Sequence, residues 1–319
     1  MANEAYVSAQ GDLLATHVVA LELEMLLHQR PFMRALASYQ GDTRGTGSDT
    51  IKKRQVDHDD IAETVAEGAA ISGNTAVTDG SYTLSPSRRS IKRIISDLLQ
   101  GIDNTALLRE IALAQYNFAA VMKAFDAAFA TAMASLTGTA GNTGVLMKAT
   151  DWFVAEQTLV SRRAAGSKAA LLYPHQWNNL RNDLRGEVGP WQLREDVQAA
   201  VAQASGDNFV GALNGTGVWI SNQVADANAG ADHGGGMFLL PRMQGPDGRM
   251  RGDAAIAYAE GSPSPVKLGT NRVMAAGGVV YSDYDLDGDK ADSVMWTNYF
   301  VAVGIADAAK GIKVITDHE

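Results

Sequence analysis

The stretch that most constrains the fold of this chain is residues 103–136, which predicts one uninterrupted helix. Asp103 or Asn104 can cap the free amides of its first turn, neither Gly nor Pro interrupts it, and Gly138 follows its end. At about 1.5 Å per residue, such a helix is roughly 50 Å long. An ordinary globular domain does not need one helix of that length.

Apolar residues in this stretch recur every three or four positions, which is the spacing of a single buried helix face. They are Leu107, Ile111, Phe118, Met122, Phe125, Phe129, Met133 and Leu136. Charged residues are few, and alanine fills eight of the sixteen positions 119–134. We therefore expect other segments to cover this helix closely over most of its length. A core helix of an α/β enzyme has the same periodicity, so the pattern alone leaves that alternative open.

Composition narrows the class of function. The chain of 319 residues has a formal net charge of −9 and as a whole repels phosphate, which argues against sequence-specific nucleic-acid binding. It has no Cys, which excludes disulfides and thiolate chemistry. Only 7% of its residues are aromatic, which favours a flat or elongated body. Neither a signal peptide nor a membrane span is recognisable, so we expect the chain to stay in the cytoplasm of the cell that makes it.

An amphipathic helix is predicted near the N-terminus, ending or kinking at Pro31, with a further helical turn over residues 32–39. Its apolar face is formed by Leu14, Val18, Leu21 and Met25. Such a helix has little of its own domain to pack on. We expect it to pack on a neighbouring molecule.

Residues 40–97 predict a projecting hairpin or a mobile segment. Two parts have strand character, residues 50–56 and 82–95, and a middle rich in Gly, Asp, Asn and Thr separates them. An exposed hairpin is marginally stable alone, and its edges favour pairing with another chain.

The charges of this hairpin are sorted by sign. The basic residues are Lys52, Lys53, Arg54, Arg88, Arg89, Lys92 and Arg93, and the acidic ones include Asp57, Asp59 and Glu63. These residues form either a solvated loop that neutralises its own charge or complementary contacts between subunits. On the second interpretation, all of them are candidates for inter-subunit contacts.

Later segments predict a layered α/β region. Thr150 is expected to cap a helix over residues 151–163, and a strand at 169–173, a break at Pro174 and a further helix follow. Residues 186–217 are interpreted as loop-rich. Further strands are predicted at residues 218–224, 237–240, 254–259, 272–282, 292–304 and 311–316, and we expect the last three to finish the chain in one sheet.

Asp283, Asp285, Asp287 and Gly288 match the first half of a calcium-binding loop, because alternate carboxylates around a Gly turn can surround a hard cation. The acidic residue expected at the twelfth position is missing, since Val294 stands there. The three aspartates are therefore weak metal candidates, and a tight acidic β-turn is the preferred interpretation.

Other candidate sites are incomplete. Asp232 with His233 and the lone His58 offer too few ligands for a metal site, and we expect all three in solvent-facing loops. His175 is expected to be structural. No phosphate loop, dinucleotide fingerprint, nucleophile elbow or zinc helix is present, so the sequence predicts neither catalysis nor a cofactor.

The order of these elements resembles the major capsid proteins of tailed bacteriophages, which share the HK97-like fold. The resemblance covers nearly the whole chain and depends on the ordered combination of three loose patterns. These are SRRSIKRIISDLLQGIDNTALLREIALAQ at the return of the hairpin, LLYPHQWNNL at the strand-proline-helix unit, and MWTNYFVAVGIADAAKGIKVITD at the end.

The resemblance implies an α+β fold with four parts. Residues 1–40 would be an N-terminal arm and residues 41–97 an extended loop. Residues 98–150 and 266–319 would form the peripheral domain with its long spine helix, and residues 151–265 the axial domain.

The resemblance also implies a structural function. Many copies would assemble as pentamers and hexamers into an icosahedral shell that encloses double-stranded DNA without sequence-specific binding, with separate scaffolding, portal and decoration proteins as partners. The location would be the virion. An encapsulin-type nanocompartment shell shares the fold and is one alternative. A soluble metal-dependent α/β enzyme that uses Asp283, Asp285 and Asp287 is another.

Overall fold

The computed structural model describes residues 32–43, 46, 48–56, 79–96, 106–162, 166–187, 208–224, 226–227, 230, 232–246, 249–261, 272–275, 280–287 and 292–317. The helix predicted before Pro31 lies outside these residues. So do residues 188–207 of the segment interpreted as loop-rich, together with His58 and the acidic hairpin residues Asp57, Asp59 and Glu63.

A six-stranded sheet is built around the 14-residue strand β16 (Asp292–Ile305), which is rich in β-branched and aromatic residues. Residues 292–299 of β16 pair antiparallel with both β4 (Ser87–Ser96) and β15 (Val280–Asp287), so this part of β16 is interior to the sheet. The sheet also contains β13 (Ile256–Glu260), β1 (Ser38–Asp42) and β14 (Arg272–Ala275). The strand predicted at residues 272–282 is thus two paired strands, β14 and β15.

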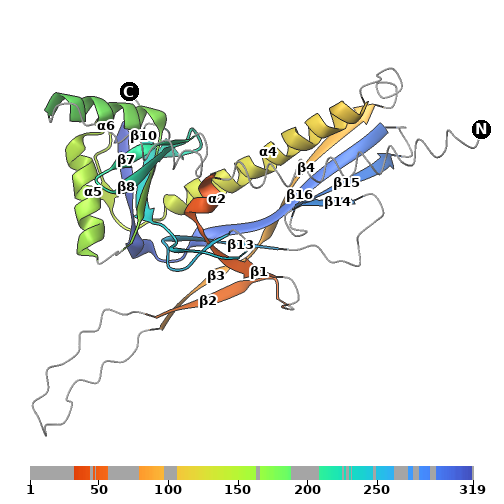
Figure 1. Cartoon of the computed structure of the whole chain (residues 1–319), viewed down its shortest axis with the longest axis horizontal. Coiled ribbons are helices and arrows are strands. Elements are labelled where there is room, and N and C mark those ends of the chain that lie inside the picture. Colours follow the sequence, from red (N-terminus) through yellow and green to blue (C-terminus); the bar gives the residue numbers. More distant parts are fainter. Residues whose placement is uncertain are drawn as a thin grey trace, which may run out of the picture.

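Helix α4 (Ala106–Met133) packs along β16 and β4 on one face of this sheet (Figure 1). It corresponds to the predicted spine helix, with its described residues starting at Ala106. Phe125, Phe129 and Met133 are fully buried, which confirms the expectation of a covered apolar face. The helix ends before the predicted residue 136, because the amides of Ser135 and Leu136 bond to carbonyls three residues earlier.

A seven-stranded sheet forms the second layer, in the order β5-β17-β10-β6-β8-β7, with β9 paired to β10. Its strands are β5 (Thr139–Ala140), β6 (Lys168–Leu172), β7 (Phe209–Leu213), β8 (Thr216–Ile220), β9 (Asp226–Ala227), β10 (Asp232–Leu239) and β17 (Gly311–Asp317). The prediction that the C-terminal strands finish in one sheet is therefore wrong. The chain leaves β16, passes through a short 3₁₀ turn, η4 (Ala308–Lys310), and continues as β17, which pairs with β10.

Both faces of the seven-stranded sheet are buried. Alternate residues of β6 and β10 contribute to opposite clusters: Leu171 and Phe238 pack with α4, whereas Leu172 and Met237 pack under α5 (Ala149–Ser161) and α6 (Pro174–Glu187). Strands buried on both faces have near-continuous apolar sequences, as the segment of β6 does.

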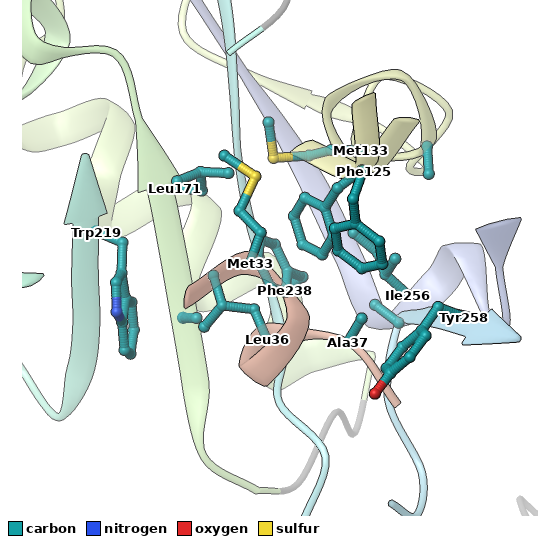
Figure 2. Close-up of a cluster of buried hydrophobic side chains, with 14 of the residues drawn as sticks. Met33, Leu36, Ala37, Phe125, Met133, Leu171, Trp219, Phe238, Ile256 and Tyr258 are labelled. Atoms are coloured by element: carbon teal, nitrogen blue, oxygen red, sulfur yellow. The ribbon is translucent and has the colours of Figure 1, made fainter. Parts of the chain in front are cut away.

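The short helix α2 (Phe32–Leu36) joins the two sheets. Figure 2 shows Met33 and Leu36 of α2 in one cluster with Phe238 of the seven-stranded sheet and Ile256 of the six-stranded sheet. The helical turn predicted over residues 32–39 ends at Leu36, because the chain continues as β1, which pairs in parallel with β13.

Strands β2 (Ile51–Val56) and β3 (Asp79–Leu84) pair antiparallel as a separate two-stranded sheet. The single strand predicted at residues 82–95 is divided at Ser85 and Pro86. Its first half stays in the hairpin as β3, and its second half becomes β4 of the six-stranded sheet. Because Pro has no amide hydrogen, it cannot continue a ladder through this point.

Three passages of the chain connect the two main sheets, and we call their meeting point the junction. The amides of Ala306 and Asp307 bond to the carbonyl of Ala255, at 2.9 and 3.2 Å. The amide of Thr137 bonds to the carbonyl of Ala308 at 3.1 Å. The passages after α4, before β13 and after β16 are therefore hydrogen-bonded to one another.

Two local predictions change in the structure. Lys148 rather than Thr150 is the N-cap residue of α5, and the Asp151 carboxylate accepts a bond from the Lys148 amide at 2.9 Å. Pro174 ends β6 as predicted and is also the first residue of α6, where its missing amide hydrogen costs no helical bond. Among the described helices, none has both the length and the apolar character that crossing a bilayer demands.

Candidate functional site

The basic residues predicted to make contacts fall on two strands. Lys52 and Arg54 of β2 are exposed and Lys53 is half-buried, opposite Ser81, Tyr82 and Thr83 of β3. Arg88, Arg89 and Lys92 of β4 are exposed, and Arg93 belongs to the same strand. Because β2 pairs with β3, the turn between β3 and β4 links the hairpin that carries the first group to the strand that carries the second.

The cations of β4 have different surroundings. Arg88 Nε donates a hydrogen bond to Asn298 Oδ1 at 2.6 Å, and Lys92 Nζ lies 5.4 Å from the centre of the Trp296 ring, in a cation–π contact. Arg89 lines a hollow together with Ala128, Thr131, Ala132, Ser135, Val303, Gly304 and Ile305. Within the residues described, no carboxylate forms an ion pair with Lys52, Arg88, Arg89 or Lys92.

Strand β4 is also a sheet edge. In the described part of the chain, its only strand partner is β16, so a ten-residue strand has one unpaired side. Unpaired edges favour pairing with other chains, and cations on an edge limit indiscriminate pairing. The basic strand β4 thus combines an open backbone edge with exposed positive charge.

The acidic motif is part of a strand. Asp283, Asp285 and Asp287 lie in β15, in register with Trp296, Val294 and Asp292 of β16, so the prediction of a tight turn at these residues is wrong. Alternate residues of a strand are roughly 7 Å apart, whereas a calcium loop curls its ligands around one ion. Among the side chains that the structure describes, no group of three potential ligands is suited to a metal ion.

Asp232 and His233 are not loop residues, and their predicted exposure is wrong. They begin β10 and are 1% and 0% exposed. Asp232 Oδ1 accepts a hydrogen bond from the Gly144 amide at 2.9 Å, and the His233 ring stacks on Tyr173 with centroids 3.6 Å apart. Tyr173 also stacks on His175, which is exposed at the start of α6.

The wrong prediction of a loop came from the run of glycines that follows His233. It belongs to β10, where neighbouring groups leave no space for side chains: a Cβ at Gly235 would lie 2.7 Å from Gln176 Oε1, and one at Gly236 would lie 2.7 Å from Met133. Glycine within a strand is the usual signal of such a close approach.

Gln176 is a buried polar contact that the sequence did not reveal. Its Oε1 accepts from the Tyr173 amide at 3.0 Å. Its Nε2 contacts the carbonyls of His233 and Val314 at 3.1 and 3.2 Å and Thr316 Oγ1 at 2.8 Å. This one side chain therefore connects α6 to β10 and β17.

A second buried group, the Glu260 network, was also missed. Glu260 of β13 is fully buried and pairs with Arg34 of α2. Arg249 Nη2 lies 2.8 Å from Glu260 Oε2, and the Tyr299 hydroxyl donates to Oε1 at 2.9 Å. Arg34 Nε also donates to the Tyr258 hydroxyl at 3.2 Å. The network connects α2, β13, β16 and the segment at residue 249.

The protonation states in this network follow from burial and charge. Burial raises the pKa of Tyr299 well above its usual value, and the nearby Glu260 charge raises it further. Burial by itself lowers the pKa of Arg34, but the interactions with Tyr299, Glu260 and Tyr258 raise it above its ordinary value. At neutral pH the arginine is charged and the tyrosine neutral, so the group stabilises the fold instead of exchanging protons.

Comparison with solved structures finds this fold in phage capsids. A chain of the capsid of Ralstonia phage GP4 is similar over 92% of both chains, with a TM-score of 0.62 and 11% sequence identity. A chain of the cyanophage Pam1 capsid is similar over 92% of both chains, with a TM-score of 0.57 and 9% sequence identity. A chain of Mycobacterium phage Che8 is similar over 84% of this chain and 85% of its own length, with a TM-score of 0.53 and 15% sequence identity.

No family model matches the sequence, and no curated protein matches it. Because the identities to the solved structures are low, the likeness concerns the fold. The chain has the α+β, HK97-like fold of phage capsid chains, which confirms the fold predicted from the order of its elements.

Proposed function

We propose that this chain is the major capsid protein of a tailed bacteriophage. Its copies assemble as pentamers and hexamers into an icosahedral head that encloses double-stranded DNA. The observation that carries the proposal is the match of the fold to phage capsid chains over about nine-tenths of both lengths. Its role is structural, and no cofactor takes part.

The exposed charge supports self-association. Lys52, Arg88, Arg89 and Lys92 have no carboxylate partner within the described residues, and the hairpin strands β2 and β3 pair only with each other there. Ions that are solvated in the free subunit can be paired across a subunit boundary. The acidic residues Asp57, Asp59 and Glu63 of neighbouring hairpins are the proposed counter-charges for these cations, with Lys53, Arg54 and Arg93 as further contacts.

We divide the chain by sheet. The six-stranded sheet with α4 is the proposed peripheral domain, and the seven-stranded sheet with α5 and α6 the axial domain. The pairing of β13 with β16 and of β17 with β10 supports this division. For the chain after residue 97, it moves residues 256–260 into the peripheral domain and residues 139–140 and 311–317 into the axial domain. Residues 1–40 remain the proposed N-terminal arm and 41–97 the extended loop, and their strands β1 and β4 join the six-stranded sheet.

The remaining parts of the proposal concern partners and location. Separate scaffolding, portal and decoration proteins would complete the head, which is assembled in the host cytoplasm and becomes part of the virion. The net charge of −9 disfavours tight binding of the enclosed DNA, so the inner wall encloses the DNA without reading its sequence.

Electron microscopy of the purified full chain, with size-exclusion chromatography at increasing concentration, tests this function. We expect closed shells of uniform diameter, or capsomers that close into shells when a scaffold is supplied. A compact monomer at high concentration, with or without scaffold, would contradict the proposal. Shells that package an enzyme instead of DNA in the producing cell would favour the nanocompartment. Divalent-metal-dependent activity that Asp285→Ala abolishes would favour the enzyme.

A further inference from the structure

Helix α5 has an outward apolar face. Its inward residues Trp152, Ala155 and Leu159 are fully buried under the seven-stranded sheet. On the other side, Phe153, Val154 and Val160 are 39%, 50% and 60% exposed. A surface helix normally presents polar residues on its solvent side, so this helix is apolar where no described element covers it.

Two more exposed apolar residues, Val145 and Leu146, directly precede this helix at 40% and 45% exposure. We call these five residues the α5 surface. The segment that carries Val145 and Leu146 is fixed: the Asp317 amide bonds to the Val145 carbonyl at 2.9 Å, and Met147 is buried. At the start of α5, the Ala149 amide bonds to Asp183 Oδ2 at 2.7 Å. These anchors hold the apolar side chains outward.

The chemistry of the α5 surface restricts its partner. The other exposed residues of the helix are Thr150, Gln157 and Ser161, none of which is charged. The charged residues that border the α5 surface are the exposed Lys148 and the half-buried Asp151 and Glu156. A single cation next to two carboxylates is a poor phosphate site, and a mainly apolar face does not attract a charged peptide. The partner surface must therefore be largely apolar.

The area of the α5 surface restricts the kind of partner further. Five partly exposed side chains present a few hundred Å², comparable to the largest apolar patch of an ordinary monomer. A stable pair of proteins buries about 800 Å² on each partner. The α5 surface is thus too small to hold an independent partner on its own. It is sufficient where other contacts already hold the neighbour at high effective concentration.

We infer that the α5 surface docks on a second copy of this chain within the assembled shell. This inference rests on the proposed capsid function, which supplies identical neighbours held by several contacts at once. Helix α5 lies at one end of the elongated body, and the tips of β15 and β16 lie at the other (Figure 1). The apolar contact at α5 is therefore separate from the charged contacts of β4, which runs beside β16.

The test uses Val160→Glu and the milder Val154→Gln, with Met243→Glu as the matched control. Met243 is 63% exposed and lies on β11 (Met243–Gln244), outside the α5 surface. We expect at least a tenfold loss of shells for Val160→Glu, a smaller loss for Val154→Gln and no loss for Met243→Glu, with the melting temperature unchanged in all three. Normal shell yield from all three variants would overturn the inference.

A second measurement does not depend on disrupting assembly. Because the chain has no Cys, Val160→Cys introduces a single thiol. We expect at least tenfold slower maleimide labelling of this thiol in shells than in dissociated subunits, and equal rates in both states for Met243→Cys. Labelling of Val160→Cys at the same rate in both states, or equal protection of both thiols, would overturn the inference. Absence of shells from the unmodified chain would instead contradict the proposed function.

Discussion

The two sheet regions of this molecule differ in how they complete their own packing. The seven-stranded region buries both faces of its sheet, and its polar groups, such as Gln176 and Asp232, bond within it. The six-stranded region has α4 on one face and, among the described strands, leaves the edge of β4 unpaired with exposed cations along it. The first region closes its own sheet on both faces, whereas the second also presents an open, charged edge suited to association. Variants at buried positions of either region should therefore affect unfolding, whereas variants on the edge of β4 should affect assembly.

The largest loss of stability is expected inside the seven-stranded region. Phe238 is fully buried and packs against Phe129 with ring centroids 5.6 Å apart. Phe238→Ala should lower the free energy of unfolding by about 4 kcal/mol, measured by urea titration, because it leaves a cavity that the rigid sheet cannot fill. Phe153→Ala, at an exposed position, should cost less than about 1 kcal/mol. Equal losses of stability from the two variants would contradict the distinction between the buried and the exposed positions of this region.

The next largest loss is expected from the Glu260 network, which belongs to the six-stranded region. Glu260→Gln leaves Arg34 and Arg249 without their buried counter-charge, and we expect a loss of about 3 kcal/mol. Lys310→Met is the control, because it removes the ion pairs with the exposed Asp253 and with Asp307 near the surface and should cost less than about 1 kcal/mol. A loss of less than 1 kcal/mol for Glu260→Gln would show that α2 is held by its apolar contacts alone.

A smaller loss is expected where α6 meets the seven-stranded sheet. Gln176→Ala removes the side chain that contacts β10 and β17 and leaves the Tyr173 amide without its partner. We expect a cost of about 2 kcal/mol in the same urea titration. Gln157→Ala on the exposed side of α5 is the matched control and should be within about 0.5 kcal/mol of the parent. The prediction fails if the two alanine variants are equally stable.

A pH-dependent gain is expected on α4. Burial raises the pKa of Asp126 from its ordinary value near 3.8 to about 7. The charged carboxylate therefore opposes folding increasingly as the pH rises from about 4 to about 7, and the penalty stays constant above that. Asp126→Asn should stabilise the chain by about 1–2 kcal/mol at pH 8 and by almost nothing at pH 4, measured by urea unfolding at both values. Asp49→Asn, at an exposed carboxylate, is the control, and an equal gain at both pH values would contradict the prediction.

The smallest change in stability should accompany a large change in assembly. Arg89→Glu combined with Lys92→Glu reverses the charge of β4 at exposed positions, and we expect less than about 1 kcal/mol in unfolding. Shell yield at low ionic strength should fall strongly, and less so near 1 M salt, where ions screen these contacts. The control pair, Lys123→Glu with Arg181→Glu, changes exposed cations outside β4. Similar yields from the two pairs would show that the basic strand makes no contact between copies.

Local patterns in the sequence were sufficient to predict those helices and strands whose structure depends mainly on their own residues. The spine helix follows from an unbroken three-and-four repeat without Gly or Pro, and the hairpin follows from two strand-like segments around a polar middle. The order of these elements was enough to predict the fold. Pro86 lies inside the segment predicted as one strand at residues 82–95, and the sequence does not show that β3 and β4 pair with different sheets on its two sides.

What could not be predicted depends on contacts between distant residues. Glu260 meets Arg34 across 226 positions, so neither residue has a local signal. The Gly run in β10 is typical of a loop when read alone, and only the approach of Gln176 and Met133 explains it as a strand. Likewise, β16 and β17 look alike in sequence, and the turn after Asp307 sends them into different sheets. In each case the decisive partner comes from another part of the chain.

The junction has a mechanical consequence. Its three passages are bonded to one another through Ala255, Thr137 and Ala308, and α2 fills the space between the two sheets. A rotation of one sheet against the other would have to break these bonds and also open the apolar cluster around α2, so each copy should behave as a single rigid body. Where a closed shell curves more sharply, we expect the angle between neighbouring copies to change at the contacts between them.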